Sequence, residues 1–185
     1  NAFTGYAVLT STWTMEFMNA ESTLVKTHLD ETSPNTIVVE SMYYEGYDIR
    51  LVRHADNRLE PLVEMPEAQV AGSTGEAFGT IYGNGKLMIE QSEESASYYS
   101  PCEGFVLQYV TMYVEEVGTV GTFAHVLEWI SDDEAERIMR EVFLDIVKDG
   151  TRSIVVSSHL LGELQKVATH YGIIRHGKMI REMTA

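Results

Sequence analysis

The sequence predicts an α+β fold, in which a mainly antiparallel sheet over residues 1–130 is followed by a helix and a C-terminal βαββ piece. Three observations indicate this. Runs rich in β-branched and aromatic residues alternate with turn residues in the first two thirds of the chain. A helical pattern begins at Ser131, and the balance of charge changes along the chain. We therefore expect an acidic β-rich region, residues 1–130, and a second region, residues 131–185.

The charge distribution supports this division. The 185 residues carry a net charge of −15. Residues 1–145 hold 7 Lys and Arg against 25 Asp and Glu, a net charge of −18, whereas residues 146–185 hold 6 against 3, a net charge of +3. Because nucleic acids are bound through Lys and Arg, the acidic surplus argues against a nucleic-acid partner. No run approaches the roughly 18 apolar residues of a membrane span, so we expect no direct span.

The β-rich region contains several strand candidates. They are "YAVLTSTWTMEFM" (6–18), "TIVVESMYY" (36–44), "YDIRLVRH" (47–54), "GFVLQYVTMYVEEV" (104–117) and "GTFAHVLEWI" (121–130). "GTIYGNGKLMIEQ" (79–91) has Asn84-Gly85 between two β-prone runs, which predicts a hairpin turn because both residues accept positive φ. "STLVKTHLDE" (22–31) competes as a helix, and "GSTGEAFG" (72–79) is typical of a loop.

The second region opens with the clearest helix of the chain. "SDDEAERIMREVFLDIVKDG" has Ser131 as an N-cap, acidic residues in its first turn and Gly150 as a stop. Ile138, Val142 and Ile146 would form its apolar face and would pack across the sheet if a later strand joined that sheet. That strand is expected at residues 153–157, followed by a helix at about 160–169 and a hairpin turning at His176-Gly177.

Most candidate sites have an ordinary structural interpretation. The glycines between Gly72 and Lys86 do not form a phosphate-binding loop, because the spacing is wrong and Lys86 precedes Leu87. A single cysteine, Cys102, excludes an internal disulfide and favours a buried structural thiol.

Neither the histidines nor the paired carboxylates predict a metal site. The six histidines lack metal-site spacing: His28, His54, His125, His159, His170 and His176. In a chain with 28 acidic residues, adjacent acidic pairs arise by composition: Glu93-Glu94, Glu115-Glu116 and Asp132-Asp133.

Two groups of aromatic residues allow two interpretations. Tyr43, Tyr44 and Tyr47 form one group, and Tyr98 and Tyr99 form the other. Tyrosine is common on half-buried sheet surfaces, which favours packing. The alternative is an exposed aromatic face that binds a peptide or saccharide.

One segment carries a family resemblance. From about Glu141 onward, "EVFLDIVKDGTRSIVVSSHLLGELQKVATHYGIIRHGKMIREMTA" resembles the C-terminal part of the ATP-binding subunit of ABC transporters, of the type associated with peptide-antibiotic and lantibiotic export. The matching elements are a helix ending in Lys-Asp-Gly, the strand "SIVVSSH", the helix "LLGELQKVATH" and the turn "GIIRHGKMI".

This resemblance implies a role for His159. In that family the histidine at this strand end lies near the γ-phosphate of ATP, so the catalytic role would fall on His159 and the cofactors would be ATP and Mg²⁺. The implied partners are a membrane transporter subunit or a second ATPase chain, and the implied location is the cytoplasm, at the membrane through that partner. The phosphate loop, the glutamine loop and the signature motif are not found in this sequence, and the strand ending in Asp-Glu has only Glu115-Glu116 as a candidate.

These observations leave three hypotheses. The chain is an ABC-transporter ATP-binding subunit derivative or fragment, related to nucleotides without autonomous ATPase activity. Alternatively, it is a non-enzymatic acidic β-rich ligand-binding or protein-interaction domain. A third hypothesis is a recombined chain whose two parts never shared a function.

Overall fold

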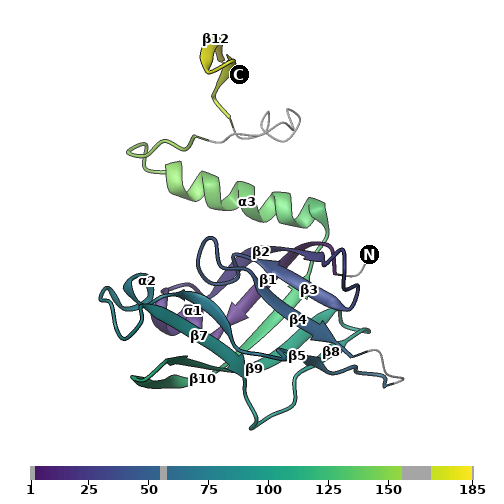
Figure 1. Cartoon of the computed structure of the whole chain (residues 1–185). Coiled ribbons are helices and arrows are strands. Elements are labelled where there is room, and N and C mark those ends of the chain that lie inside the picture. Colours follow the sequence, from purple (N-terminus) through teal and green to yellow (C-terminus); the bar gives the residue numbers. More distant parts are fainter. Residues whose placement is uncertain (1–2, 55–57, 156–167, 185) are drawn as a thin grey trace. The chain divides into compact units, whose positions relative to one another are not determined.

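The structure, a computed structural model, describes residues 3–54, 58–155 and 168–184 (Figure 1). The chain divides into two compact units, Asn1–Asp132 and Asp133–Ala185. Within the described ranges, no helix is both long enough and apolar enough to cross a membrane.

The first unit is mainly antiparallel sheet. Ten strands form one sheet within the described residues. They are β1 (Gly5–Ser11), β2 (Ser22–Leu29), β3 (Thr36–Glu40), β4 (Ile49–Arg53), β5 (Val63–Glu64), β6 (Gln69–Ser73), β7 (Lys86–Gln91), β8 (Tyr98–Ser100), β9 (Phe105–Val114) and β10 (Gly118–Trp129). The predicted antiparallel sheet is therefore confirmed, and the fold is more strongly β than the sequence indicated.

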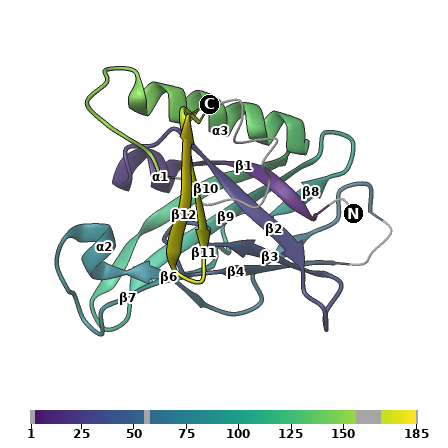
Figure 2. The same cartoon turned by 90° about the horizontal axis from the view of Figure 1, so that it is seen from above.

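The sheet closes on itself. Its strand order is β5-β4-β3-β2-β1-β10-β9-β7-β6, and β8 also pairs with β9. Residues before β5 complete the ring: Leu62 forms an antiparallel bridge with Tyr98, and the Tyr99 amide donates to the Pro61 carbonyl oxygen at 2.9 Å. Figure 2 shows the strands surrounding a common interior. A closed sheet leaves few unpaired strand edges, which limits edge-to-edge association.

Alternating side chains fill the interior. On β9 every second residue is buried, beginning with Val106, and the same alternation occurs on β10 around His125. Leu9, Trp13 and Met112 are fully buried in this core. Burying a side chain of this size stabilises the fold by about 1.5–3 kcal/mol.

Two short helices lie at one end of the closed sheet (Figures 1 and 2). The expected strand at residues 6–18 is wrong in its second half, because β1 ends at Ser11 and α1 (Thr12–Phe17) follows. The Ser11 hydroxyl caps this helix by accepting from the Trp13 amide. The expected loop at residues 72–79 is also wrong, because α2 (Thr74–Phe78) begins at a capping box formed by Ser73 and Glu76.

Two further expectations need correction. The helix candidate at residues 22–31 is the strand β2, whose β-branched residues pack on β1 and β3. Asn84-Gly85 is not a two-residue hairpin turn: β6 pairs with β7, but α2 and a loop at residues 79–85 lie between them. In that loop Gly83 and Gly85 have positive φ and Asn84 does not, because Asn84 instead accepts from the Lys86 amide through its side chain.

The second unit contains a helix and a hairpin. α3 (Asp132–Val147) begins directly after Ser131, as predicted, and the chain turns at Gly150, whose φ is 71°. β11 (His170–Arg175) and β12 (Lys178–Thr184) pair antiparallel and turn at His176-Gly177, which confirms the predicted hairpin.

The expected strand at residues 153–157 is wrong where it is described. Residues 153–155 lie in no strand. The remainder of that strand, and nearly all of the helix expected at 160–169, lie outside the described residues.

Candidate functional site

The site residue implied by the resemblance, His159, lies outside the described residues. The structure does not bring the other histidines together. His28 pairs with Glu40 at 3.0 Å on β2 and β3, and His54 pairs with Glu64 at 2.9 Å beside β4 and β5. Across residues 3–54, 58–155 and 168–184, no group of three or more His, Cys, Asp or Glu side chains is placed to hold a metal ion.

The tyrosine groups do not form one exposed face. Tyr43 is 4% exposed and Tyr99 is 8% exposed, and both belong to the core. Tyr99 packs edge to face against Phe3 at a centroid distance of 4.8 Å. Tyr44 is half-buried, and its hydroxyl accepts from the Trp13 indole nitrogen at 3.3 Å. For these tyrosines the packing interpretation is confirmed. The cysteine prediction is wrong, because Cys102 is exposed in the turn between β8 and β9.

A chain of hydrogen bonds crosses the interior. The Tyr43 hydroxyl lies 2.7 Å from Nδ1 of His125, and Nε2 of His125 lies 2.8 Å from Oε1 of Gln108. Since an amide oxygen only accepts, His125 carries its proton on Nε2, and Nδ1 accepts from Tyr43. The Gln108 amide donates to Oε1 of Gln91 at 3.1 Å, and the Gln91 amide donates to the Ser97 hydroxyl at 2.7 Å. Every link therefore donates in the same direction.

Burial sets the protonation of this interior chain. Desolvation lowers the pKa of His125 from 6.5 to about 3, so its imidazole is neutral at pH 7. Desolvation also raises the pKa of Tyr43 well above its ordinary value, which keeps its hydroxyl protonated. With both ring nitrogens bonded and 1% exposure, His125 is enclosed in the core. These hydrogen bonds stabilise the fold and orient the buried side chains, because a reacting molecule cannot reach His125.

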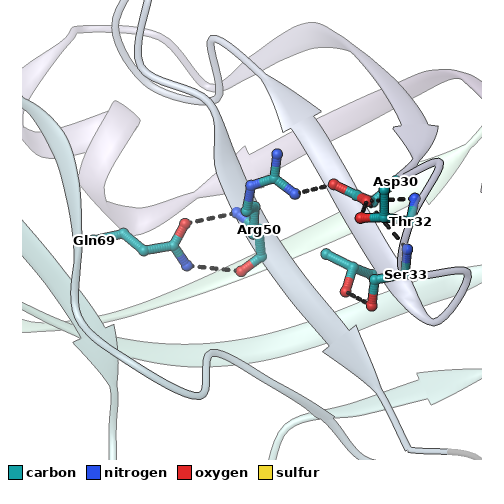
Figure 3. Close-up of polar contacts among 6 residues, drawn as sticks. Asp30, Thr32, Ser33, Arg50 and Gln69 are labelled. Atoms are coloured by element: carbon teal, nitrogen blue, oxygen red, sulfur yellow. Dashed lines mark hydrogen bonds and ion pairs between the residues drawn. The ribbon is translucent and has the colours of Figure 1, made fainter.

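A second polar cluster lies at the surface (Figure 3). After β2, the Asp30 carboxylate accepts from the Thr32 amide at 2.9 Å and from the Ser33 amide at 3.1 Å, and it forms an ion pair with Arg50 on β4. The Arg50 and Thr32 hydrogen bonds hold the pKa of Asp30 well below its usual range. The side-chain amide of Gln69 donates to the Arg50 carbonyl oxygen at 2.7 Å and accepts from the Arg50 amide at 2.8 Å. Gln69 thus joins β6 to β4 as a backbone segment would.

The end of the closed sheet near α2 has a different character. The loop at residues 79–85 lies against the turn between β9 and β10, since a Cβ added to Gly83 would be 3.0 Å from a methyl group of Val117. Ile81, Tyr82 and Val117 are exposed there, and we call these three residues the loop-end surface. Glu115-Glu116, an acidic pair that the composition alone explains, lies in the same turn, and Asn84 donates to the Glu115 carboxylate at 3.3 Å.

Sequence reasoning missed the loop-end surface for an identifiable reason. The pattern around Asn84-Gly85 predicts a tight hairpin, which leaves no loop to carry exposed side chains. Three glycines at positions 79, 83 and 85, all with positive φ, mark a structured loop. Their spacing was the available signal.

Comparison with known proteins identifies a family for most of the chain. Residues 1–141 match the family described as Domain of unknown function (DUF4984). The chain belongs to this family. Among curated proteins and among solved structures, none matches the chain. The DUF4984 match includes the whole closed sheet, the interior hydrogen bonds and the loop-end surface, and it ends in α3.

Proposed function

We propose that the closed-sheet unit is a non-enzymatic binding domain that recognises a positively charged protein segment. The observation that carries this proposal is its charge. Residues 1–132 contain 5 Lys and Arg against 20 Asp and Glu, a net charge of −15, whereas residues 133–185 contain 8 of each and are neutral. A field of this strength attracts cations and repels anions, so it favours basic partners and speeds their association.

The interior supports a binding role at the surface. Large apolar side chains fill much of the interior, and the buried side chains of Tyr43, His125 and Gln108 bond to one another. The buried histidine is neutral and enclosed, which does not suit it to proton transfer with an outside molecule. Recognition is therefore assigned to the outer surface.

A synthetic peptide in which lysine alternates with leucine tests this proposal. We expect it to bind the full chain, and the affinity should fall steeply as salt is raised from 50 to 300 mM. A matched peptide in which glutamate alternates with leucine is the control and should not bind. Calorimetry measures both. Equal affinity for the two peptides, or no binding of the lysine peptide, would overturn the proposal.

A second function is proposed for the C-terminal residues. From residue 141 onward, the chain would be a derivative of an ABC-transporter ATP-binding subunit, with His159 beside the γ-phosphate of ATP and Mg²⁺. Two observations favour this: the DUF4984 match ends at residue 141, where the resemblance begins, and the hairpin turns at His176-Gly177 as the resemblance implies. Its partner would be a transporter subunit or a second ATPase chain, in the cytoplasm at the membrane.

Calorimetry with ATP and Mg²⁺ tests this second function. Binding that disappears in His159→Ala would support it, and the absence of binding would overturn it. Limited proteolysis addresses the origin of the chain. Two separately resistant fragments that meet between residues 132 and 141 would fit a recombined chain, whereas one cooperative resistant unit would oppose it.

A further inference from the structure

We infer that the loop-end surface is the docking surface for this partner, a protein segment in which basic residues flank apolar ones. The inference rests on the proposed function of the closed-sheet unit and adds the place of binding and the apolar part of the ligand.

The loop-end surface exposes large apolar side chains from two separate segments. Ile81 is 77% exposed, Tyr82 is 46% exposed and Val117 is 58% exposed. Ile81 and Tyr82 belong to the loop between α2 and β7, and Val117 belongs to the turn between β9 and β10. Single exposed apolar residues are common on protein surfaces, but neighbouring ones on adjoining segments are typical of interaction sites.

Hydrogen bonds fix the loop that carries these side chains. The Thr74 hydroxyl accepts from the Tyr82 amide at 3.0 Å, and the Thr74 amide donates to the Gly85 carbonyl oxygen at 3.0 Å. The Gly85 amide donates to the Tyr82 carbonyl oxygen at 2.9 Å. The ring of Phe78 packs edge to face on Tyr82 at a centroid distance of 5.9 Å. A binding surface that is held in place before binding loses less conformational entropy when a partner docks.

Gly83 allows the loop at residues 79–85 to contact the turn between β9 and β10 closely. Its φ is 54°, and an added Cβ would lie 3.0 Å from methyl groups of both Val114 and Val117 and 3.1 Å from the Glu115 carbonyl oxygen. Only glycine permits this close approach. The exposed side chains of the loop and of the turn are therefore presented as one surface.

Acidic side chains lie beside the apolar ones. The turn carries Glu115 and Glu116, and a shallow open hollow is lined by residues 113–119. Glu90 and Glu115 contribute, after desolvation, to raising the pKa of Tyr113, which places both negative charges near that hydroxyl. Lys86 is the single base in residues 79–91 and 113–119, against these three acids. The rim is therefore negative and matches the charge of the whole unit.

This combination selects one kind of occupant. Burying the exposed apolar side chains against apolar groups of a partner is favourable, and the carboxylates attract Lys or Arg side chains of that partner. The surface of an anionic membrane would be repelled by the same carboxylates. The occupant that satisfies both features is a protein segment with alternating or adjacent basic and apolar residues.

Surface variants titrated with the lysine–leucine peptide test the inference. Ile81→Ser combined with Val117→Ser should weaken binding by about tenfold or more, because it removes the apolar contacts. Glu115→Gln combined with Glu116→Gln should weaken binding by about threefold to tenfold at low salt and flatten the salt dependence. Chemical-shift changes in the wild-type protein should concentrate on residues 79–85 and 114–118.

Matched controls use the same substitutions elsewhere. Leu59→Ser removes an apolar side chain that is 91% exposed, and Glu93→Gln with Glu94→Gln removes an adjacent acidic pair that is also exposed. Both controls should bind the peptide as the wild type does. A peptide in which lysine alternates with serine should bind at least about tenfold more weakly than the lysine–leucine peptide.

The outcomes separate the two proposals. If the lysine–leucine peptide binds but the variants of the loop-end surface bind as well as their controls, this location is wrong and the proposed function stands. If the lysine–serine peptide binds equally well, the apolar part of the inference is wrong. If neither lysine peptide binds, both proposals fall.

Discussion

Two polar clusters link distant strands of the closed sheet, one inside and one at the surface. In the interior, Tyr43 beyond β3 is joined through His125 on β10 to Gln108 on β9. At the surface, Gln69 on β6 is joined to Arg50 on β4, which also reaches Asp30. Both clusters use ordinary polar side chains. They differ in access to water: the interior groups have no replacement partner, whereas water can take over each bond of the surface cluster.

The largest expected effect comes from acidifying the interior. Unfolded His125 has an ordinary pKa of 6.5, whereas burial lowers the folded pKa to about 3. The unfolded chain therefore binds a proton first, and stability is lost as pH falls below 6.5. At pH 4 the loss from this group is about 3 kcal/mol. Urea unfolding as a function of pH measures it.

Two variants sharpen that result. His125→Gln removes the titrating group and should remove this slope between pH 6.5 and 4. Tyr43→Phe keeps the imidazole buried and should keep the slope, because desolvation lowers the pKa. A slope that persists in His125→Gln would assign the acid sensitivity to other groups.

The same substitution in both clusters compares them directly. Gln108→Leu should lower the free energy of unfolding by about 2 kcal/mol, since it leaves the buried Nε2 hydrogen of His125 without an acceptor and removes one of the two donors to Oε1 of Gln91, which keeps the Met65 amide. Gln69→Leu should cost less than about 1 kcal/mol, because water can reach the Arg50 backbone. Denaturant titration measures both. Equal losses would contradict the distinction between interior and surface.

A smaller effect is expected at the boundary between core and surface. Gly72 lies under the ring of Tyr44, and an added Cβ would be 2.4 Å from that ring. Gly72→Ala should therefore cost about 1 kcal/mol, because the half-buried ring can shift but loses contacts. Gly46→Ala is a useful comparison, since no atom lies near its added Cβ and only its φ of 87° is strained. A thermal melt of each variant separates steric crowding from backbone strain.

The smallest effect is expected for the Asp30 charge. Asp30→Asn should reduce stability slightly at pH 7, and less so in high salt, because the partner Arg50 is 54% exposed. The folded pKa of Asp30 is lowered, so its contribution is present above the ordinary value of 3.8 and is lost as pH falls below it. The difference between variant and wild type should therefore vanish only in strong acid. A difference that vanishes already between pH 6 and 5 would contradict this assignment.

The long, periodic elements of the fold could be predicted from the sequence. β9 and β10 have clear alternation, α3 has an N-cap and a stop signal, and the β11–β12 hairpin has its turn at His176-Gly177. The short helices α1 and α2 could not be predicted, because helices of five or six residues depend on caps and tertiary contacts. Closure of the sheet could not be predicted from the sequence either, since it depends on an isolated bridge between Leu62 and Tyr98.

The candidate site was less accessible to prediction than the fold. The interpretation of Tyr43 as a packing residue was correct, but its bond to His125 joins residues 82 positions apart. The loop-end surface depends on Gly83 contacting Val117, a contact between two turns that no local pattern specifies. Charge was the exception, because the acidic surplus of the first region is a sum over the sequence.

The single direction of the interior hydrogen bonds has a consequence for how the family changes over time. Replacing Gln108 by an apolar residue would remove the acceptor of His125 Nε2 and one donor to Gln91 Oε1, and one further change would not restore both. Tolerated substitutions at these hydrogen-bonded positions should therefore occur together. Among DUF4984 sequences, we expect positions 43, 91, 108 and 125 to covary, so that members either retain all four polar side chains or replace them together with apolar ones.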